Sequence, residues 1–344
     1  MISEDEFNYN VEMAKMRIRK LYNKFGNNIY LSYSGGKDST VVLALIKLVI
    51  ADGLPIKCPA VFCDTKIELN ATKEFVDYIK NEYYNDVVII KPDKSFDYVI
   101  KNYGKPIRSK LKSRLLSDMQ KNPNLKGCTI LYSNVRSRFS LADKDLHFIH
   151  PDFDIKISNK CCDYLKKIPF KKYAKQNEMG GYFTGERAAE GGIRAVNYDK
   201  RIMQGKSPCT VMDGKSEKVS PIIDWSDDMC DLFIEKYKVP LSKAYTIYGC
   251  TRTGCFLCPF SINIANNLYT LYKYEPNNYK ASMHWLKYVY IAQNVKLPFD
   301  NDYEIERKNK WENTYGKMRY EMLLKYRPKS KLISQYRKNK SKLF

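Results

Sequence analysis

Six consecutive residues beginning at Ser34 bring together the groups that a phosphate-binding loop needs. Its members are Ser34, Gly35, Gly36, Lys37, Asp38 and Ser39. The two glycines allow the backbone to approach an anion closely, and the two serines add hydroxyl donors. Lys37 supplies a mobile positive charge, and Asp38 could orient the loop or hold a magnesium ion that bridges phosphates.

The segments on either side of this loop predict how it is held. Residues 29–33 are an apolar run that predicts a short buried strand, and residues 39–50 are apolar nearly all round, which predicts a helix packed on a sheet. A strand–loop–helix unit directs backbone N–H groups and a helix N-terminus at a bound anion. A plain Gly-Gly turn is the alternative, but six residues in this context favour phosphate binding. The spacing of a Walker loop, G-x-x-x-x-G-K-[ST], is absent.

The ten cysteines are unevenly spaced, and their clusters indicate a metal site. The clustered thiols are Cys161, Cys162, Cys250, Cys255 and Cys258. Two thiolates three residues apart in a turn can bind one metal centre, whereas adjacent cysteines fit two irons of a cluster better than one tetrahedral zinc. Zinc bound by the last three, and cysteines without any metal, remain open alternatives. The scattered thiols are interpreted as small buried apolar residues; they are Cys58, Cys63, Cys128, Cys209 and Cys230.

The hydrophobic pattern predicts the elements that position these groups. After a helix over residues 8–25, strands at 29–33, 59–63 and 86–90 alternate with helices at 39–50 and about 68–82. This order predicts an α/β fold: a parallel twisted sheet with helices on both faces. A further strand is expected at 180–184. A helix that runs to about Tyr237 is expected after a cap at Asp224 or Ser226. From residue 264 the chain is expected to be helical, with a basic tail at 325–342.

The formal net charge is +21, from 59 basic and 38 acidic residues. Such a surplus favours polyanionic partners, although an AT-rich genome would also produce the many Lys, Asn, Ile and Tyr residues. No apolar run approaches the roughly 20 residues of a membrane helix. The acidic N-terminus lacks the basic and apolar regions of a signal peptide. We therefore expect a cytoplasmic protein with no membrane partner.

The hexapeptide resembles the PP-loop of the ATP pyrophosphatases and of their relatives, the adenylyl-sulfate and phosphoadenylyl-sulfate (PAPS) reductases. The resemblance continues at 61–65, Val-Phe-Cys-Asp-Thr, and implies that Asp64 and Thr65 lie near the adenosine; a cap on the next helix is the alternative for Asp64. Residues 184–190 resemble the family's Gly-x-Arg segment, which implies that Arg187 and Arg194 meet the phosphate or sulfate. A solvated charged loop is the alternative for both.

The adjacent cysteine pair followed by C-x-x-C is similar to the four-iron four-sulfur site of the assimilatory adenylyl-sulfate reductases. This resemblance implies a [4Fe-4S] cluster held by Cys161, Cys162, Cys255 and Cys258. Cys250 is the competitor for a ligand position, or a thiol that accepts sulfur. The implied fold is Rossmann-like, of the PP-loop type. We expect residues 1–262 to form the nucleotide-binding domain with these ligands, and residues 263–344 to form a helical basic extension.

Two departures from the reductases guide the choice of reaction. The reductases usually carry a catalytic cysteine in a C-terminal Glu-Cys-Gly-Leu-His segment, and this chain has no cysteine after Cys258. Its loop also has the full form that is typical of relatives that split ATP to AMP and pyrophosphate. Relatives that combine such a loop with an iron–sulfur site include the sulfur-inserting enzyme of DNA phosphorothioation and certain tRNA-thiolating enzymes.

The first hypothesis is therefore an ATP- and Mg²⁺-dependent sulfurtransferase that adenylates an acceptor oxygen, DNA or RNA being the candidate acceptors. Sulfur from a donor protein, carried by the cluster or a cysteine persulfide, would then displace AMP. The candidate catalytic residues are Lys37, Asp38, Arg187 and Cys250. The second hypothesis is a reductase of adenylyl sulfate or PAPS, with the missing thiol supplied by Cys250 or by a thiol reductant protein. The third is a non-catalytic nucleotide- or nucleic-acid-binding module.

Overall fold

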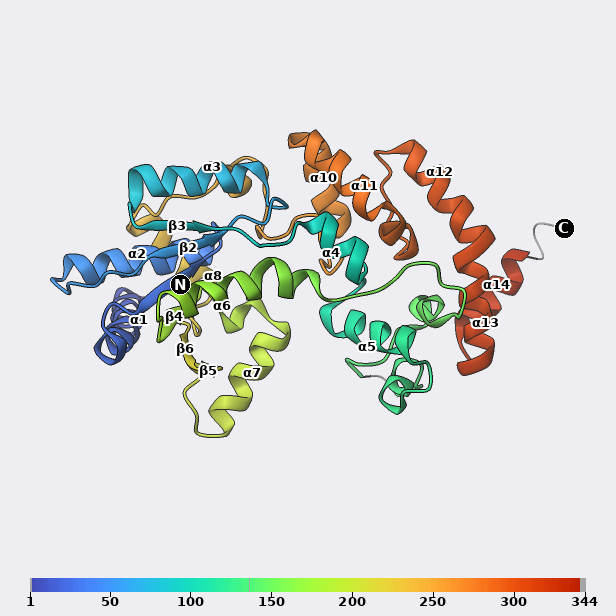
Figure 1. Cartoon of the computed structure of the whole chain (residues 1–344), viewed down its shortest axis with the longest axis horizontal. Coiled ribbons are helices and arrows are strands. Elements are labelled where there is room, and N and C mark those ends of the chain that lie inside the picture. The colour runs from blue at the N-terminus through green and yellow to red at the C-terminus, as the bar shows by residue number, and fades with distance from the viewer. Residues whose placement is uncertain (1, 136, 341–344) are drawn as a thin grey trace. The chain divides into compact units, whose positions relative to one another are not determined.

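The computed structural model describes residues 2–135 and 137–340, and the chain forms two compact units (Figure 1). Unit 1 comprises Met1–Asp93 and Lys166–Gly254, and unit 2 comprises Lys94–Leu165 and Cys255–Phe344. The units are thus interleaved along the chain. This division differs from the predicted boundary at 262/263, because residues 94–165 associate with the C-terminal helices. Residues 341 and 342 of the predicted basic tail lie outside the described residues.

Unit 1 is built on a six-stranded sheet with the order β3-β2-β1-β4-β6-β5. The strands are β1 (Ile29–Tyr33), β2 (Ala60–Cys63), β3 (Val87–Ile90), β4 (Gly181–Phe183), β5 (Thr210–Asp213) and β6 (Ser216–Val219). All neighbours are parallel except β5 and β6, and β1 pairs with both β2 and β4. The order along the sheet reverses at β1 and β4, and such a switch point opens a crevice at the carboxyl ends of the strands. The predicted fold class is confirmed.

The side chains of β1 alternate between the two faces of the sheet. Ile29, Leu31 and Tyr33 join the hydrophobic core with α1 (Glu4–Phe25), α2 (Lys37–Ala51) and α8 (Asp227–Lys236). On the other face, the Tyr30 ring stacks on Phe170 of α6 (Ile168–Gln176) and on Tyr182, with centroids 6.2 and 5.3 Å apart. Helices therefore cover both faces, as the sequence predicts.

Several elements of unit 1 differ in detail from the prediction. The helix expected at 68–82 is α3 (Asn70–Tyr78) followed by a π-helical turn at Ile79–Tyr83. The β5–β6 hairpin was not predicted, because its strands are four residues long and half exposed. Ser226 is the N-cap of α8: its hydroxyl oxygen accepts a hydrogen bond from the Met229 N–H at 3.1 Å. The remaining helices of this unit are α7 (Gly192–Met203), α9 (Lys243–Thr246) and the 3₁₀ turn Ala188–Glu190.

Unit 2 is helical in both of its chain segments. Its α-helices are α4 (Phe96–Tyr103), α5 (Lys110–Lys121), α10 (Ile264–Tyr274), α11 (Pro276–Ala292), α12 (Asn301–Lys310), α13 (Gly316–Tyr326) and α14 (Lys331–Lys340). Shorter helical turns lie at Lys126–Leu131, Asp143–Ile149 and Trp311–Tyr315. The two segments are joined by packing of α13 on residues 143–149 and by an ion pair of 2.5 Å between Arg327 and Asp143. The predicted helical character after residue 264 is confirmed.

The charge surplus is concentrated in unit 2. That unit has 31 basic and 14 acidic residues, a net +17, whereas unit 1 has 28 and 24, a net +4. No helix within the described residues has both the length and the apolar character needed to cross a membrane.

Candidate functional site

The predicted phosphate loop connects β1 to α2, next to the switch point of the sheet. Gly35 has a φ of +69°, and a Cβ at this position would lie 2.8 Å from the Thr72 Cγ2 atom, so both conformation and space require glycine. Gly36 is the N-cap of α2 and offers no side-chain cap, which leaves the place of a capping group at the helix N-terminus open to an anion. The two hydroxyls, of Ser34 and Ser39, lie 3.0 Å apart and brace the turn.

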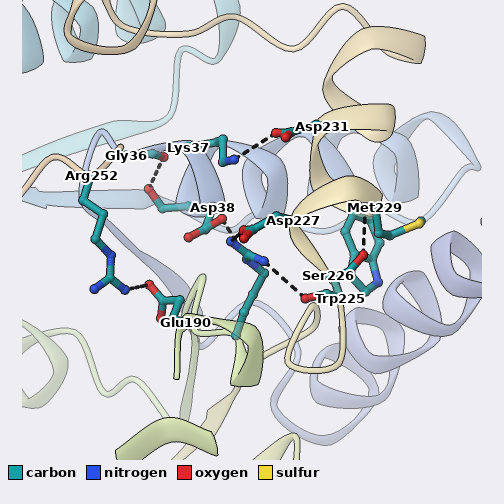
Figure 2. Close-up of polar contacts among 12 residues, drawn as sticks. Gly36, Lys37, Asp38, Glu190, Trp225, Ser226, Asp227, Met229, Asp231 and Arg252 are labelled. Atoms are coloured by element: carbon teal, nitrogen blue, oxygen red, sulfur yellow. Dashed lines mark hydrogen bonds and ion pairs between the residues drawn. The ribbon is translucent and has the colours of Figure 1, made fainter. Parts of the chain in front are cut away.

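Lys37 is held at the start of α2 by two contacts. Its ammonium group lies 2.9 Å from the Asp231 carboxylate on α8, as Figure 2 shows. Burial lowers the pKa of Lys37, but the pairing with Asp231 outweighs this and raises it overall, so the side chain stays positively charged. The backbone N–H of Lys37 donates to the Tyr245 hydroxyl at 3.0 Å, and that hydroxyl also lies 3.0 Å from the Thr253 Oγ1 atom.

Asp38 and Asp227 share one arginine (Figure 2). Arg187 is 3% exposed; its Nε donates to Asp38 at 2.9 Å, its Nη2 to Asp227 at 2.7 Å, and its Nη1 to the Trp225 carbonyl at 3.3 Å. Burial raises the pKa of Asp38 above its ordinary value, against the opposing effect of Arg187. All three nitrogen atoms of Arg187 are therefore occupied in this structure, and the guanidinium fixes the Asp38 carboxylate.

Gly185 brings the end of β4 against the loop. A Cβ at residue 185 would lie 2.6 Å from the Ser39 backbone nitrogen and 2.7 Å from the Asp38 carbonyl carbon. Backbone atoms cannot move aside cheaply, so only glycine allows this approach. The contact places the segment with Arg187 beside the first turn of α2.

Asp64 and Thr65 follow β2 and close a tight turn. The Asp64 carboxylate accepts from the Lys66 N–H at 3.1 Å, and the Thr65 hydroxyl donates to Glu68 at 2.6 Å. Burial raises the pKa of Asp64, but the hydrogen bonds from Lys66 outweigh it and lower the value overall. Asp64 is not the cap of α3, whose N-cap is Leu69.

A cavity of about 580 Å³, which we call the loop cavity, lies beside the loop in unit 1. Its wall includes the loop residue Ser34, together with Arg194 and Thr253. Aromatic side chains form another part of its wall: Tyr30, Phe170 and Tyr182. The basic residues Lys166, Lys167, Lys171 and Lys218 also line it. Apolar rings beside cationic groups suit a nucleotide, which has a base with π faces and an anionic tail.

Arg194 joins an ion-pair network at this cavity. It pairs with Glu190, which ends the 3₁₀ turn before α7, and Glu190 also pairs with Arg252, as Figure 2 shows for the latter contact. Of the predicted nucleotide-binding residues, Ser34 and Arg194 thus lie on the wall of the loop cavity. Asp38 and Arg187 are joined by their hydrogen bond.

Four of the clustered thiols, Cys161, Cys162, Cys255 and Cys258, belong to unit 2, and Cys250 belongs to unit 1. A side-chain hydrogen bond with Cys162 and burial raise the pKa of Cys161, and Cys255 and Cys258 add to this effect. No three His, Cys, Asp or Glu residues within 2–135 and 137–340 are arranged as a metal site. Among the scattered thiols, Cys58, Cys63, Cys128 and Cys230 are buried as predicted, and Cys209 is half-buried.

The sequence did not predict the residues that contact the loop and its arginine from far along the chain. Asp227, Asp231, Tyr245 and Thr253 approach it from a chain segment about 200 residues later, as the sequence separations of 194 and 208 residues show for two of them. None belongs to a recognisable motif. The only signal was the capped helix start near Ser226, which places Asp227 and Asp231 one turn apart on α8.

This fold and loop define an α/β protein of the PP-loop class. The model of the phosphoadenosine phosphosulfate reductase domain matches residues 28–127 and 114–261. The chain belongs to this family, and the resemblance predicted from the sequence is confirmed.

Two curated proteins from Methanocaldococcus jannaschii are similar to this chain in sequence. The uncharacterized protein MJ0066 is 24% identical over 242 residues, 70% of this chain and 38% of the relative. The uncharacterized protein MJ0973 is 24% identical over 250 residues, 72% of this chain and 46% of the relative. The chain thus spans less than half the length of these curated relatives.

Solved structures with a similar chain path include three enzymes of low sequence identity. A PAPS reductase from Candida auris in a phosphate complex has a TM-score of 0.42 at 15% identity, over 74% of this chain and 96% of that chain. An FMN adenylyltransferase from Candida glabrata has a TM-score of 0.42 at 13% identity, over 73% of this chain and 62% of that chain. The U34-tRNA thiolase NcsA from Methanococcus maripaludis with its [4Fe-4S] cluster has a TM-score of 0.38 at 12% identity, over 84% of this chain and 81% of that chain.

Proposed function

We propose that this protein cleaves ATP with release of pyrophosphate and uses the adenylyl group to activate an acceptor oxygen for sulfur transfer. The observation that carries the proposal is the complete loop at the switch point of the sheet, with an uncapped α2 N-terminus and a cavity of about 580 Å³ beside it. This arrangement provides donors for phosphate oxygens next to a space large enough for a nucleoside.

The proposed first step is attack of the acceptor oxygen on the α-phosphorus of ATP. The bond between the α-phosphorus and the bridging oxygen breaks, and pyrophosphate leaves. Lys37 and the first-turn amides of α2 would stabilise the charge on the departing phosphates, and Asp38, held by Arg187, would bind Mg²⁺.

In the second step a sulfur nucleophile at the oxidation level of sulfide forms a bond to the acceptor carbon, and AMP leaves with the oxygen. This step is a substitution and needs no oxidant or reductant. The donor protein is the proposed source of the sulfide. Cys250, which follows Gly249 at a φ of +68°, is the proposed thiol in unit 1 that receives a sulfane sulfur by attacking a persulfide of the donor protein, whose thiolate leaves. A thiol reductant protein would then reduce the Cys250 persulfide, releasing sulfide for the second step and leaving the reductant as a disulfide.

We further propose that Cys161, Cys162, Cys255 and Cys258 hold a [4Fe-4S] cluster. The chemistry of the donor set supports this proposal, because four thiolates are the usual ligands of this cluster. When bound, the cluster would supply a site for sulfide or for electrons.

The test is to incubate anaerobically purified protein with ATP or adenylyl sulfate, with and without RNA or DNA, and to measure AMP, pyrophosphate and sulfite. We expect pyrophosphate release that depends on nucleic acid. In Lys37→Ala this rate should fall by about 100-fold or more, the usual cost of losing one charged donor to a developing anion. Lys20→Ala is the matched control, because Lys20 is an exposed lysine on α1 in the same unit.

The reductase remains the second candidate because the family model carries that description. Sulfite release from adenylyl sulfate without pyrophosphate release from ATP would contradict the sulfurtransferase proposal. Nucleotide binding with neither product would favour the non-catalytic module. Unchanged nucleotide binding in both Ser34→Ala and Lys37→Ala would contradict the assignment of the loop itself.

A further inference from the structure

Unit 2 contains a second cavity, of about 460 Å³, whose charged lining residues are all basic. We call it the basic cavity; its cationic residues are Arg108, Lys144, Lys296 and Arg319. No Asp or Glu is among the residues that line it. Every lining residue belongs to unit 2, so the cavity is complete within that unit.

Arg319 lies on the wall of the basic cavity, over an aromatic ring. Its guanidinium carbon is 5.1 Å from the centroid of the Trp311 ring, and the indole is fixed by a hydrogen bond of 2.6 Å from Nε1 to the Ile291 carbonyl. Within the described ranges of the chain, no carboxylate lies at ion-pair distance from Arg319; burial lowers its pKa, against the opposing effect of the Asp145 carboxylate. A partly desolvated cation on an aromatic surface attracts an anion more strongly than a solvated one does.

Arg108, in contrast, is already compensated. Its Nη2 donates to Asp145 at 2.5 Å and to the Gln293 carbonyl at 3.1 Å, and its own backbone N–H donates to the Gln293 side chain at 2.6 Å. Its Nε is buried and has no hydrogen-bond partner within the described part of the chain. Arg108 therefore shapes the wall, while the cations of the lining that form no ion pair within the described residues are Arg319 and the exposed Lys144 and Lys296.

The N-terminus of α10 forms another part of the wall, through residues 263–266. The N-cap Asn263 makes no side-chain cap hydrogen bond, and the first N–H groups of a helix have no acceptor within the helix. These amides and the positive end of the helix dipole favour an anion in the cavity that Lys144, Lys296 and Arg319 also line.

We propose that the basic cavity binds backbone phosphates of a single nucleic-acid strand. The cavity supplies the local donors, and the net charge of +17 on unit 2 extends the attraction beyond one phosphate, as a polyanion requires. Only the role of the strand as the acceptor rests on the proposed function. Binding of the strand is independent of it, because binding can be measured without ATP.

The test is fluorescence anisotropy of the full chain with labelled single-stranded RNA and DNA oligonucleotides of one sequence, over a range of salt concentrations. In the double variant Lys144→Gln/Lys296→Gln we expect affinity to fall by roughly tenfold at low salt. The slope of log K against log salt should fall by about 0.7 for each lost phosphate contact. Both lysines are exposed, so this variant should fold normally. Arg319→Gln should weaken binding further, with unfolding temperature as the check on its fold.

Lys280→Gln is the matched control, because Lys280 is an exposed lysine on α11 of the same unit outside the cavity. An equal loss of affinity in this variant would mean that binding is spread over the whole unit and would overturn the proposal. Displacement of the strand by micromolar inorganic phosphate would identify a small-anion site and would overturn it too. If the cavity variants lose binding while pyrophosphate release from ATP is absent in the wild type, the cavity proposal stands and the proposed function fails.

Discussion

The two units differ in how the cations of their candidate anion-binding sites are paired with carboxylates. Around the loop of unit 1, Lys37 and Arg187 are paired with carboxylates, and the unit as a whole has a net charge of only +4. Around the basic cavity of unit 2, Arg319, Lys144 and Lys296 form no ion pair with any residue that the structure describes, and the unit has a net charge of +17. Paired cations are pre-oriented for one ligand geometry, whereas unpaired cations accept phosphates in many geometries. This difference supports the proposals that the loop of unit 1 binds one ligand in a fixed geometry and that the basic cavity of unit 2 attracts a polyanion.

The largest expected effect comes from Gly185→Ala, which should break the organised site of unit 1. The new Cβ would lie 2.6 Å from the Ser39 nitrogen, so the loop or β4 must shift. Because a displacement of about 1 Å can cost 100-fold in rate, we expect at least that loss of pyrophosphate release, with oligonucleotide binding retained. Gly127→Ala is the control, since nothing lies within 4 Å of a Cβ there. Normal activity in Gly185→Ala would contradict the close approach of β4 to the loop.

Cys161→Ser tests whether iron binding by the thiols of unit 2 is independent of ATP cleavage at the loop of unit 1. We expect the loss of at least half of the bound iron and acid-labile sulfide after anaerobic reconstitution, because a serine hydroxyl is a poor ligand for a cluster. Pyrophosphate release from ATP, assigned to unit 1, should change by less than about twofold. Cys128→Ser is the matched control, a buried thiol of the same unit outside the proposed ligand set. Equal iron content in the two variants would rule out the assignment of Cys161.

Asp227→Asn should have the smallest effect and should depend on pH. The hydrogen bond from Arg187 holds the pKa of Asp227 below its ordinary value of 3.8. A carboxyl group whose folded pKa is depressed stabilises the fold above its unfolded pKa, and this contribution is lost as pH falls through the folded value. Because the Asp227 side chain is 69% exposed, the stabilisation should be only about 0.5 kcal/mol at neutral pH.

Chemical denaturation of Asp227→Asn at neutral pH and below pH 4 measures this contribution. We expect the difference from the wild type to disappear at the acid end. The control is Asp228→Asn, which changes a neighbouring exposed carboxylate on the same helix. A difference that persists at low pH would show that packing, and not the ion pair, is responsible.

The sequence predicted the fold of unit 1 well, because local patterns determine its elements. The loop, β1, α2 and the alternation around Tyr30 follow from apolar runs and a single glycine pair. The contacts of Lys37 with Asp231 and Tyr245 could not be predicted, since they depend on how α8 and α9 return to the loop. The roles of Asp64, Thr65, Arg187, Arg194 and Cys250 at the nucleotide remain predictions.

Unit 2 was less accessible to prediction for a related reason. The basic composition of residues 95–150 resembles that of a solvated surface, yet Arg108 and Asp145 form an ion pair whose acid is 3% exposed. Pattern alone cannot show that these residues pack against helices that begin at Ile264, more than 100 residues later.

The interleaved chain path also has a consequence for biosynthesis. Translation completes residues 94–165 well before any part of 255–344 exists. The intervening residues 166–254 take roughly 4 to 18 s to synthesise at about 5–20 residues per second. During that interval the nascent chain carries Cys161 and Cys162 without Cys255 and Cys258, and the segment Asp143–Ile149 without α13 to cover it. Unit 2 must therefore close after translation of its helices, and a chaperone that shields the first segment would act in that interval.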